Sequence, residues 1–257
     1  MQLGKSDLDF FDENGFLVLR EFVDERECNA ILDIAKIHIK YMIEPIETEE
    51  EYHIQPKEER VNRVDYNSRV EGTIRRLRQV YDRDIIFKNW MESRKIRPIL
   101  EQILRDRAVI TTAHHNSIMT KMPMNSRETR WHQDIRYWSF SDKNLISIWL
   151  ALGEESSSNG VLEVIPKSHK LNLNSIQFDD KEYFREDLEE NIPLIDRKIT
   201  LKLSKGDVLI FHSNLLHRAD RNRTDSAKIS FVYSVKGSKT ETVKNSRSSS
   251  YPEIFLD

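Results

Sequence analysis

The segment WHQDIRYW, residues 131–138, is the strongest candidate for a metal site in the sequence. In an extended chain, residues two apart point the same way, so His132 and Asp134 can reach one metal ion while Gln133 turns away. Two imidazoles and one carboxylate form the ligand set of non-haem Fe(II) oxygenases, which leaves coordination positions for a chelating co-substrate and dioxygen. The spacing therefore predicts two ligands, and a third must come from a distant segment.

A second segment, GDVLIFHSNLLHRADRN at residues 206–222, offers two histidines as the third ligand. His212 ends the apolar run VLIF and can equally sit in the core, whereas His217 begins a polar turn where a ligand is accessible. The pattern favours His217 and leaves His212 open. Elsewhere, His114 and His115 are adjacent and would face opposite ways, and the sequence assigns neither to a site. If the HxD pair is only a polar strand edge, no metal is bound.

The strands that would position these residues are predicted from Val109 onward. Short β-branched and aromatic runs there, such as NLISIWLAL and AKISFVYSV, are separated by Gly, Pro, Ser and Asn turns without intervening helices. That pattern favours a mostly antiparallel sandwich or barrel. A polar insertion at 171–197 interrupts it and is expected to cover one mouth, and the tail KGSKTETVKNSRSSSYP is expected to be loose.

Upstream of these strands, the sequence predicts helices. Residues 7–14 and 24–43 have helical patterns on either side of the apolar run FLVL, and TIRRLRQVYDRDIIFKNWM and IRPILEQILRDR predict two helices packed outside a sheet. Residues 44–60, with two prolines and many acids, predict a loop. The chain is therefore predicted to be one domain, with a helix-rich support at 1–105, a β core at 106–235 and a polar tail at 236–257.

Composition excludes several classes of function. Lysine and arginine total 40 against 43 acidic residues, and the net charge of -3 produces no overall field that would recruit nucleic acid or an anionic membrane. The single cysteine, Cys28, excludes an internal disulfide framework and a cysteine-rich zinc site. The start of the chain lacks the order of a secretory signal, and no apolar run approaches the roughly 20 residues that span a bilayer. We therefore expect a cytoplasmic protein.

Four segments together resemble the phytanoyl-CoA dioxygenase family of Fe(II)/2-oxoglutarate oxygenases: FFDENGFLVLREFVDERE, WHQDIRYW, NGVLEVIPKSHK and GDVLIFHSNLLHRADRNRTDSAK. They span most of the chain in the family's order. The resemblance implies a mainly β fold, a double-stranded β-helix or cupin-like jelly roll with helices packed on one sheet. It also implies that His217 rather than His212 is the third ligand and that His169 belongs to a structural loop.

The resemblance further implies how 2-oxoglutarate binds. Its 1-carboxylate and keto oxygen chelate the iron, and its distal carboxylate meets a cation eleven residues after the second histidine, usually arginine and here Lys228. An ammonium neutralises a carboxylate but cannot form the bidentate fork of a guanidinium. Ala219 stands where relatives commonly carry a hydroxyl, for which Ser230 can compensate. These departures keep two alternatives open: an iron oxygenase that does not use 2-oxoglutarate, and a catalytically silent metal- or ligand-binding protein.

Other positions match the family less firmly. Arg76 falls where relatives carry a cation near the co-substrate, although a solvated helix charge is an equal interpretation, and Trp149 is placed with the co-substrate. Tyr137 and Gln133 are placed with the substrate, and Lys121 faces either the pocket or solvent. The predicted reaction hydroxylates a C–H bond and releases succinate and CO2. Acid-rich segments favour a small metabolite over a CoA ester as the substrate.

Overall fold

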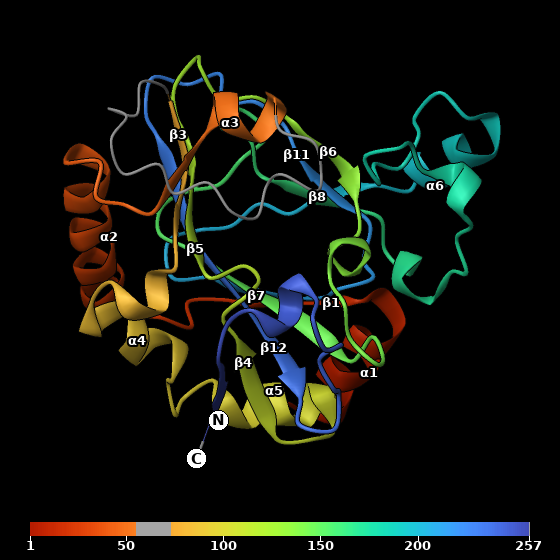
Figure 1. Cartoon of the computed structure of the whole chain (residues 1–257), viewed down its shortest axis with the longest axis horizontal. Coiled ribbons are helices and arrows are strands. Elements are labelled where there is room, and N and C mark those ends of the chain that lie inside the picture. The colour runs from red at the N-terminus through yellow and green to blue at the C-terminus, as the bar shows by residue number, and fades with distance from the viewer. Residues whose placement is uncertain (55–72, 257) are drawn as a thin grey trace.

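The structure is a computed structural model that describes residues 1–54 and 73–256, and it consists of two antiparallel sheets with helices on the outer face of the larger one (Figure 1). The larger sheet has the order β1-β10-β7-β12-β5-β3-β2, with β4 beside β12 and β13 beside β4. Its strands are β1 (Phe16–Leu19), β2 (Ile46–Thr48), β3 (Ile74–Arg78), β4 (Ala108–Thr111), β5 (Ser117–Lys121), β7 (Leu145–Ala151), β10 (Val208–His212), β12 (Lys228–Gly237) and β13 (Glu253–Phe255).

The smaller sheet has the order β6-β11-β8-β9. Its strands are β6 (Thr129–His132), β8 (Leu162–Val164), β9 (Ile199–Thr200) and β11 (His217–Ala219). The helices of the described residues are α1 (Lys5–Asn14), α2 (Glu25–Lys40), α3 (Glu49–Ile54), α4 (Ile85–Met91), α5 (Arg97–Leu104) and α6 (Ile192–Ile195). Two facing sheets with helices on one of them form the mainly β jelly roll that the sequence predicts.

Successive side chains of β12 point to opposite faces of the larger sheet. One face packs against the helices and forms the hydrophobic core, and the other faces the space between the two sheets, here called the interior. Odd-numbered residues from Ile229 to Val235 join the core that α2, α4 and α5 bury, where the rings of Phe87 and Phe231 meet edge to face at 5.6 Å. Even-numbered residues point towards the smaller sheet, and Val232 packs with strand β8. Lys228 and Ser230, at two of the other even positions, are therefore placed in the interior.

A β-bulge makes β3 differ from its prediction. The stretch TIRRLR, predicted as a helix, is a strand in which Glu47 pairs with Arg76 and Thr48 pairs with Ile74, leaving Arg75 as an extra residue. Ile74 and Leu77 consequently both face the helices, while Arg75 and Arg76 both line the interior. Arg76 is therefore not a solvated helix charge.

The predicted loop and tail also differ from expectation. Within 44–60, the described residues form β2 and α3, and residues 55–60 lie outside the described part. The tail is ordered against the sheet, because Glu253–Phe255 pairs with β4 and Ser248 bonds to the ring of His114. Insertion 171–197 projects beyond the smaller sheet (Figure 1). No helix among the described residues is long and apolar enough to cross a membrane.

Candidate metal centre

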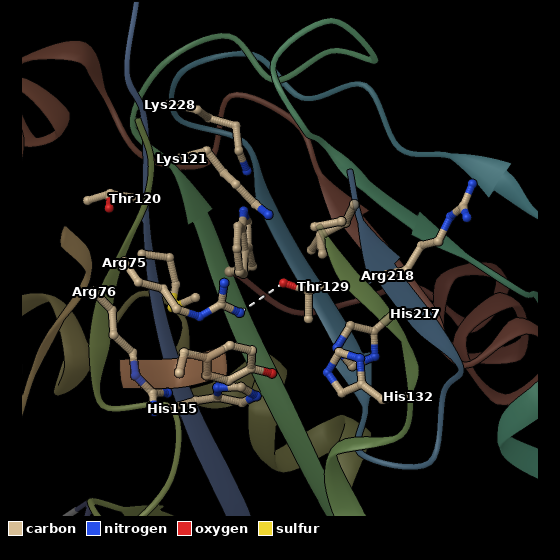
Figure 2. Close-up of a pocket in the computed structure, with 15 residues that line it drawn as sticks. Arg75, Arg76, His115, Thr120, Lys121, Thr129, His132, His217, Arg218 and Lys228 are labelled. Carbon is tan, nitrogen blue, oxygen red and sulfur yellow. Dashed lines mark hydrogen bonds between the residues drawn. The ribbon is translucent and has the colours of Figure 1, made fainter. Parts of the chain in front are cut away.

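Three side chains converge where the smaller sheet meets the interior. Ligand atoms of His132, Asp134 and His217 all lie within 4.8 Å of one another, and each imidazole Nε2 is 3.7 Å from Oδ1 of Asp134. His132 and His217 are cross-strand partners on β6 and β11, with ring centroids 4.1 Å apart (Figure 2). Asp134 begins the short 3-10 turn that follows β6. The HxD spacing and one register pair thus assemble the group.

Hydrogen bonds to the backbone orient both imidazoles. Nδ1 of His132 bonds to the carbonyl of Arg130 at 2.8 Å, and Nδ1 of His217 bonds to that of Leu215 at 3.0 Å. A proton on Nδ1 leaves the Nε2 lone pair for a metal. Burial, and then the neighbouring His217, lowers the pKa of His132 to about 3, and burial also lowers the pKa of His217. Both rings are therefore neutral at pH 7, as metal ligands must be.

The carboxylate of Asp134 is held from two sides. Its Oδ2 accepts a hydrogen bond from Ser147 Oγ at 3.0 Å, and Nε2 of His115 lies 2.8 Å from Oδ1. Burial raises the pKa of this carboxyl, but the nearby His115 and His217 outweigh it and hold the pKa below its usual range. Asp134 is therefore ionised and ready to bind a cation.

His115 is a site residue that sequence reasoning missed. It lies between β4 and β5 with a left-handed backbone, φ 43°, which turns its ring towards the metal group. His114 turns the other way, stacks on Trp138 at 4.9 Å and bonds to Ser248. The adjacent histidine pair was the available signal, and only the fold distinguishes its two members.

His212 lies away from the metal group. Its Nδ1 accepts a hydrogen bond from the backbone of Asn214 at 3.0 Å, and its ring is 5.4 Å from that of His169. His169 in turn fills the space beside Gly15, where a Cβ would come within 2.4 Å of the ring. Both histidines thus brace the turn that leads into His217.

Gln133 and Tyr137 do not line the pocket. The buried amide of Gln133 donates to the carbonyl of Asn214 in the interior of the fold. The substrate contact predicted for Gln133 stays a prediction. The hydroxyl of Tyr137 donates to the carbonyl of Lys181 at 2.8 Å, and its ring meets His132 edge to face at 6.2 Å. For Tyr137 the substrate role stays a prediction.

A pocket extends from the two histidines towards β3, β5 and β12 (Figure 2). It encloses about 680 Å³ outside the protein atoms, a volume that includes the open mouth. Its lining includes two histidine ligands, His115, an aromatic wall and several cations: His132, His217, His115, Trp149, Arg75, Arg76, Lys121, Arg218 and Lys228.

The three side chains predicted to hold the co-substrate, Lys228, Ser230 and Trp149, surround a carboxylate of the protein itself, that of Glu155. Lys228 Nζ lies 3.0 Å from Oε2 of Glu155, while Trp149 Nε1 and Ser230 Oγ donate to Oε1 at 2.9 and 2.6 Å. The side chains of Lys228 and Glu155 are 3% and 0% exposed. The structure thus brings Lys228, Ser230 and Trp149 together, but around a glutamate that sequence reasoning missed.

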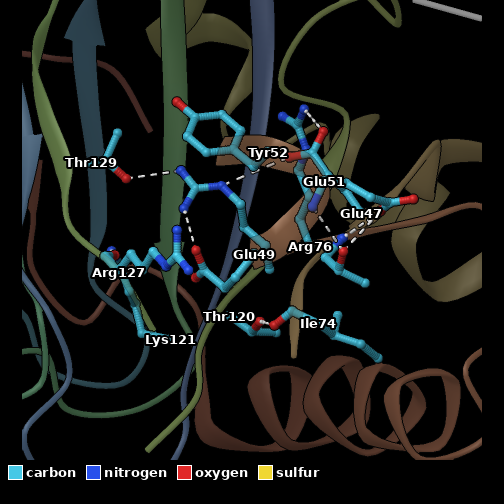
Figure 3. A network of polar contacts seen from close by, with 12 residues as sticks. Glu47, Glu49, Glu51, Tyr52, Ile74, Arg76, Thr120, Lys121, Arg127 and Thr129 are labelled. Atoms are coloured by element: carbon cyan, nitrogen blue, oxygen red, sulfur yellow. Dashed lines mark hydrogen bonds and ion pairs between the residues drawn. The ribbon is translucent and has the colours of Figure 1, made fainter. Parts of the chain in front are cut away.

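The arginines of the bulge are also paired with carboxylates (Figure 3). Arg76 donates to Glu47 at 2.6 Å. Arg75 lies 3.3 Å from Glu49 and donates to Thr129 Oγ1 at 2.9 Å. Arg75 was missed because the sequence predicts a helix here, and only the bulge of the observed strand brings it into the pocket.

Lys121 is the exception among these cations. It is the cross-strand partner of Lys228, it is 6% exposed, and its ammonium donates to the carbonyl of Arg127. Within the described part of the chain, no carboxylate lies within ion-pair distance of it. Like charges placed directly opposite destabilise a sheet. Burial, together with the charges of Arg75 and Lys228, lowers the pKa of Lys121 to about 7. Among the residues that the structure describes, Lys121 is therefore a pocket cation without a counter-charge.

The sequence matches known proteins over most of its length. A family model described as phytanoyl-CoA dioxygenase (PhyH) matches residues 11–230. The chain is similar to peroxisomal phytanoyl-CoA dioxygenase of Homo sapiens, with 26% identity over 235 residues that cover 84% of this chain. The match covers 63% of that relative, so the chain spans less than two thirds of its length.

Solved structures share the fold at low sequence identity. The apo form of EctD from S. alaskensis has a TM-score of 0.75 and 18% identity, covering 94% of this chain and 80% of that one. The epimerase SnoN in complex with Fe3+, alpha ketoglutarate and nogalamycin RO has a TM-score of 0.73 and 13% identity, covering 94% and 87%. These likenesses confirm the predicted jelly roll.

Proposed function

The chain belongs to the phytanoyl-CoA dioxygenase family, and from that premise we propose that it is a non-haem Fe(II) dioxygenase that uses 2-oxoglutarate to hydroxylate a C–H bond of a small metabolite. The observation that carries the proposal is the convergence of His132, Asp134 and His217 at the head of a pocket. The complex of SnoN with Fe3+ and alpha ketoglutarate supports it through the shared fold.

The donor set fits iron. Two neutral imidazoles and one ionised carboxylate leave the pocket side of the metal position open, as the facial ligand set of non-haem iron requires. Bound there, Fe(II) supplies the positions at which 2-oxoglutarate and dioxygen react, giving succinate, CO2 and a hydroxylated substrate. The chain's own contribution is orientation: backbone carbonyls fix both imidazoles, and Ser147 fixes the carboxylate.

In this proposal Lys121, rather than Lys228, meets the distal carboxylate of the co-substrate. Glu155 already neutralises Lys228, and both are buried, so a second carboxylate there would face a repelling charge. Among the described residues the Lys121 ammonium has no ion-pair partner, so its positive charge is available to meet the negative charge of the distal carboxylate. Trp149 lines the pocket and donates to Glu155, and Ser230 also holds Glu155 in place.

The deciding experiment is an anaerobic titration of the protein with Fe(II), with and without 2-oxoglutarate, followed by oxygen and a succinate measurement. A metal-to-ligand charge-transfer band that needs both components, and succinate on aeration, are expected. Asp134→Ala is the control that should show neither. Iron binding without the band at millimolar 2-oxoglutarate would instead indicate an oxygenase that does not use this co-substrate, and a band without succinate would indicate a silent binding protein.

A further inference from the structure

We propose that a second cavity beside the metal pocket, lined by Arg76, Arg78 and Arg247, binds a carboxylate or phosphate group of the primary substrate. The inference rests on the proposed function in one respect, since it takes the metal pocket as the place of reaction. It assigns the substrate to a chemical class: a small molecule that carries an oxyanion.

The cavity is built from β3, the segment before β5 and the tail. Arg76 and Arg78 are two apart on β3 and face the same side, and Arg247 comes from a 3-10 turn, Arg247–Ser249, of the ordered tail. The remaining lining is mostly polar and includes Gln79, Thr112, His115, Asn116, Ser117 and Tyr251. A polar cavity with several guanidinium groups is suited to an oxyanion, because guanidinium binds carboxylate and phosphate bidentately.

Charge at this cavity is unbalanced. Glu47 bonds to Arg76, but within the described residues the side chains of Arg78 and Arg247 have no hydrogen-bond or ion-pair partner. Burial, followed by the charges of Arg76 and Arg78, lowers the pKa of Arg247 to about 10. Burial and then Arg76 lower the pKa of Arg78. Holding these cations together costs free energy that a bound oxyanion would offset.

Its position links the cavity to the reaction. Arg76 and His115 line both this cavity and the metal pocket, and His115 Nε2 is 2.8 Å from the Asp134 carboxylate. In Figure 2, Arg76 and His115 lie at one end of the metal pocket, and Lys121 and Lys228 lie at the other. An oxyanion among the arginines would therefore leave the lysine end to 2-oxoglutarate and direct the rest of the substrate into the metal pocket.

The test is titration of the full chain with inorganic phosphate and, separately, with acetate, at constant ionic strength, followed by melting temperature and calorimetry. Arg78→Met and Arg247→Met are the probes, and Lys244→Met is the matched control, since it removes an exposed charge from the same tail. Phosphate or acetate should raise the melting temperature of the wild type. Either arginine variant should weaken binding by about tenfold or more, as expected for loss of a charge-assisted hydrogen bond.

The two conditions should give opposite orders of stability. Without anion, the arginine variants should melt at the same temperature as the wild type or higher, because a repelling cation is gone; with saturating phosphate they should melt lower. Absence of binding of both anions to the wild type, or an equal loss in Lys244→Met, overturns the proposal. Competition between phosphate and 2-oxoglutarate also overturns it, since the arginines would then hold the co-substrate. Phosphate binding without any 2-oxoglutarate binding would reject the proposed function and leave the anion site standing.

Discussion

Glu155→Gln should destabilise the ligand-free protein and strengthen its binding of 2-oxoglutarate. Glutamine keeps an acceptor oxygen for Trp149 and Ser230 but leaves the Lys228 ammonium without a counter-charge. Because both members of the pair are almost fully buried, water does not screen the change, and removing one partner of such a pair costs about 3–5 kcal/mol. For a chain of this length, the melting temperature should fall by on the order of 10 °C.

The same substitution should create a second anchor for the co-substrate. With Glu155 neutral, Lys228 stands beside Lys121 as an available cation, and one added charge-assisted hydrogen bond of about 1.5 kcal/mol lowers the Kd roughly tenfold. Binding of 2-oxopentanoate, which lacks the distal carboxylate, should not change. 2-Oxoglutarate should therefore raise the melting temperature of the variant by more than it raises that of the wild type.

Thermal melts and anaerobic titration of the Fe(II) form measure the two effects. Glu163→Gln is the matched control, because Glu163 pairs with Arg218 at 2.5 Å but both side chains are partly exposed, at 16% and 23%. It should lose little stability and gain no affinity. Glu155→Gln could instead weaken the binding of 2-oxoglutarate, or strengthen the binding of 2-oxopentanoate by the same factor. Either result would show that Glu155 does not occupy, at Lys228, the place of a distal carboxylate, and would refute the reasoning.

Three more predictions concern the metal ligands and the co-substrate. His217→Ala should abolish iron retention after desalting while His212→Ala keeps it, and the reverse result would refute the ligand assignment. Ser147→Ala should weaken Fe(II) binding by about 10- to 100-fold in anaerobic titration. Its control is Ser234→Ala, the cross-strand partner whose buried hydroxyl has no hydrogen-bond partner in the described part of the chain. An equal loss in this control would contradict the role of Ser147. Because the pKa of Lys121 is about 7, its charged form declines as pH rises, so the Kd for 2-oxoglutarate should increase roughly tenfold from pH 6 to pH 8. Lys121→Met should bind weakly at both pH values, and a persistent pH dependence would exclude this lysine as its source.

Local spacing made the HxD pair predictable. His132 and Asp134 need only the two-residue period of an extended chain, and β12 could be read from its alternation. By contrast, Glu155 reaches Lys228 from 73 positions away, and His115 reaches Asp134 through a loop conformation. Such contacts depend on register and loop geometry, which no local pattern contains.

The misreading of β3 has a specific physical cause. Ile74, Leu77 and Val80 are three residues apart, which is a helical spacing, and all three are buried in the helix-side core. The bulge makes that spacing compatible with a strand by placing two residues between successive core positions. Propensity could not distinguish the two, because arginine suits a helix and the pairing with β5 is set far along the chain.

Because of the bulge, a change of one residue would be enough to alter the pocket. Loss of a single codon, that of Arg75 or Arg76, would restore regular alternation between Ile74 and Leu77, so both would keep their places against the helices. The pocket would lose one guanidinium group, while Ile74 and Leu77 would keep their positions in the hydrophobic core. Insertion or deletion at this position would therefore change the charge of the pocket without rebuilding the fold.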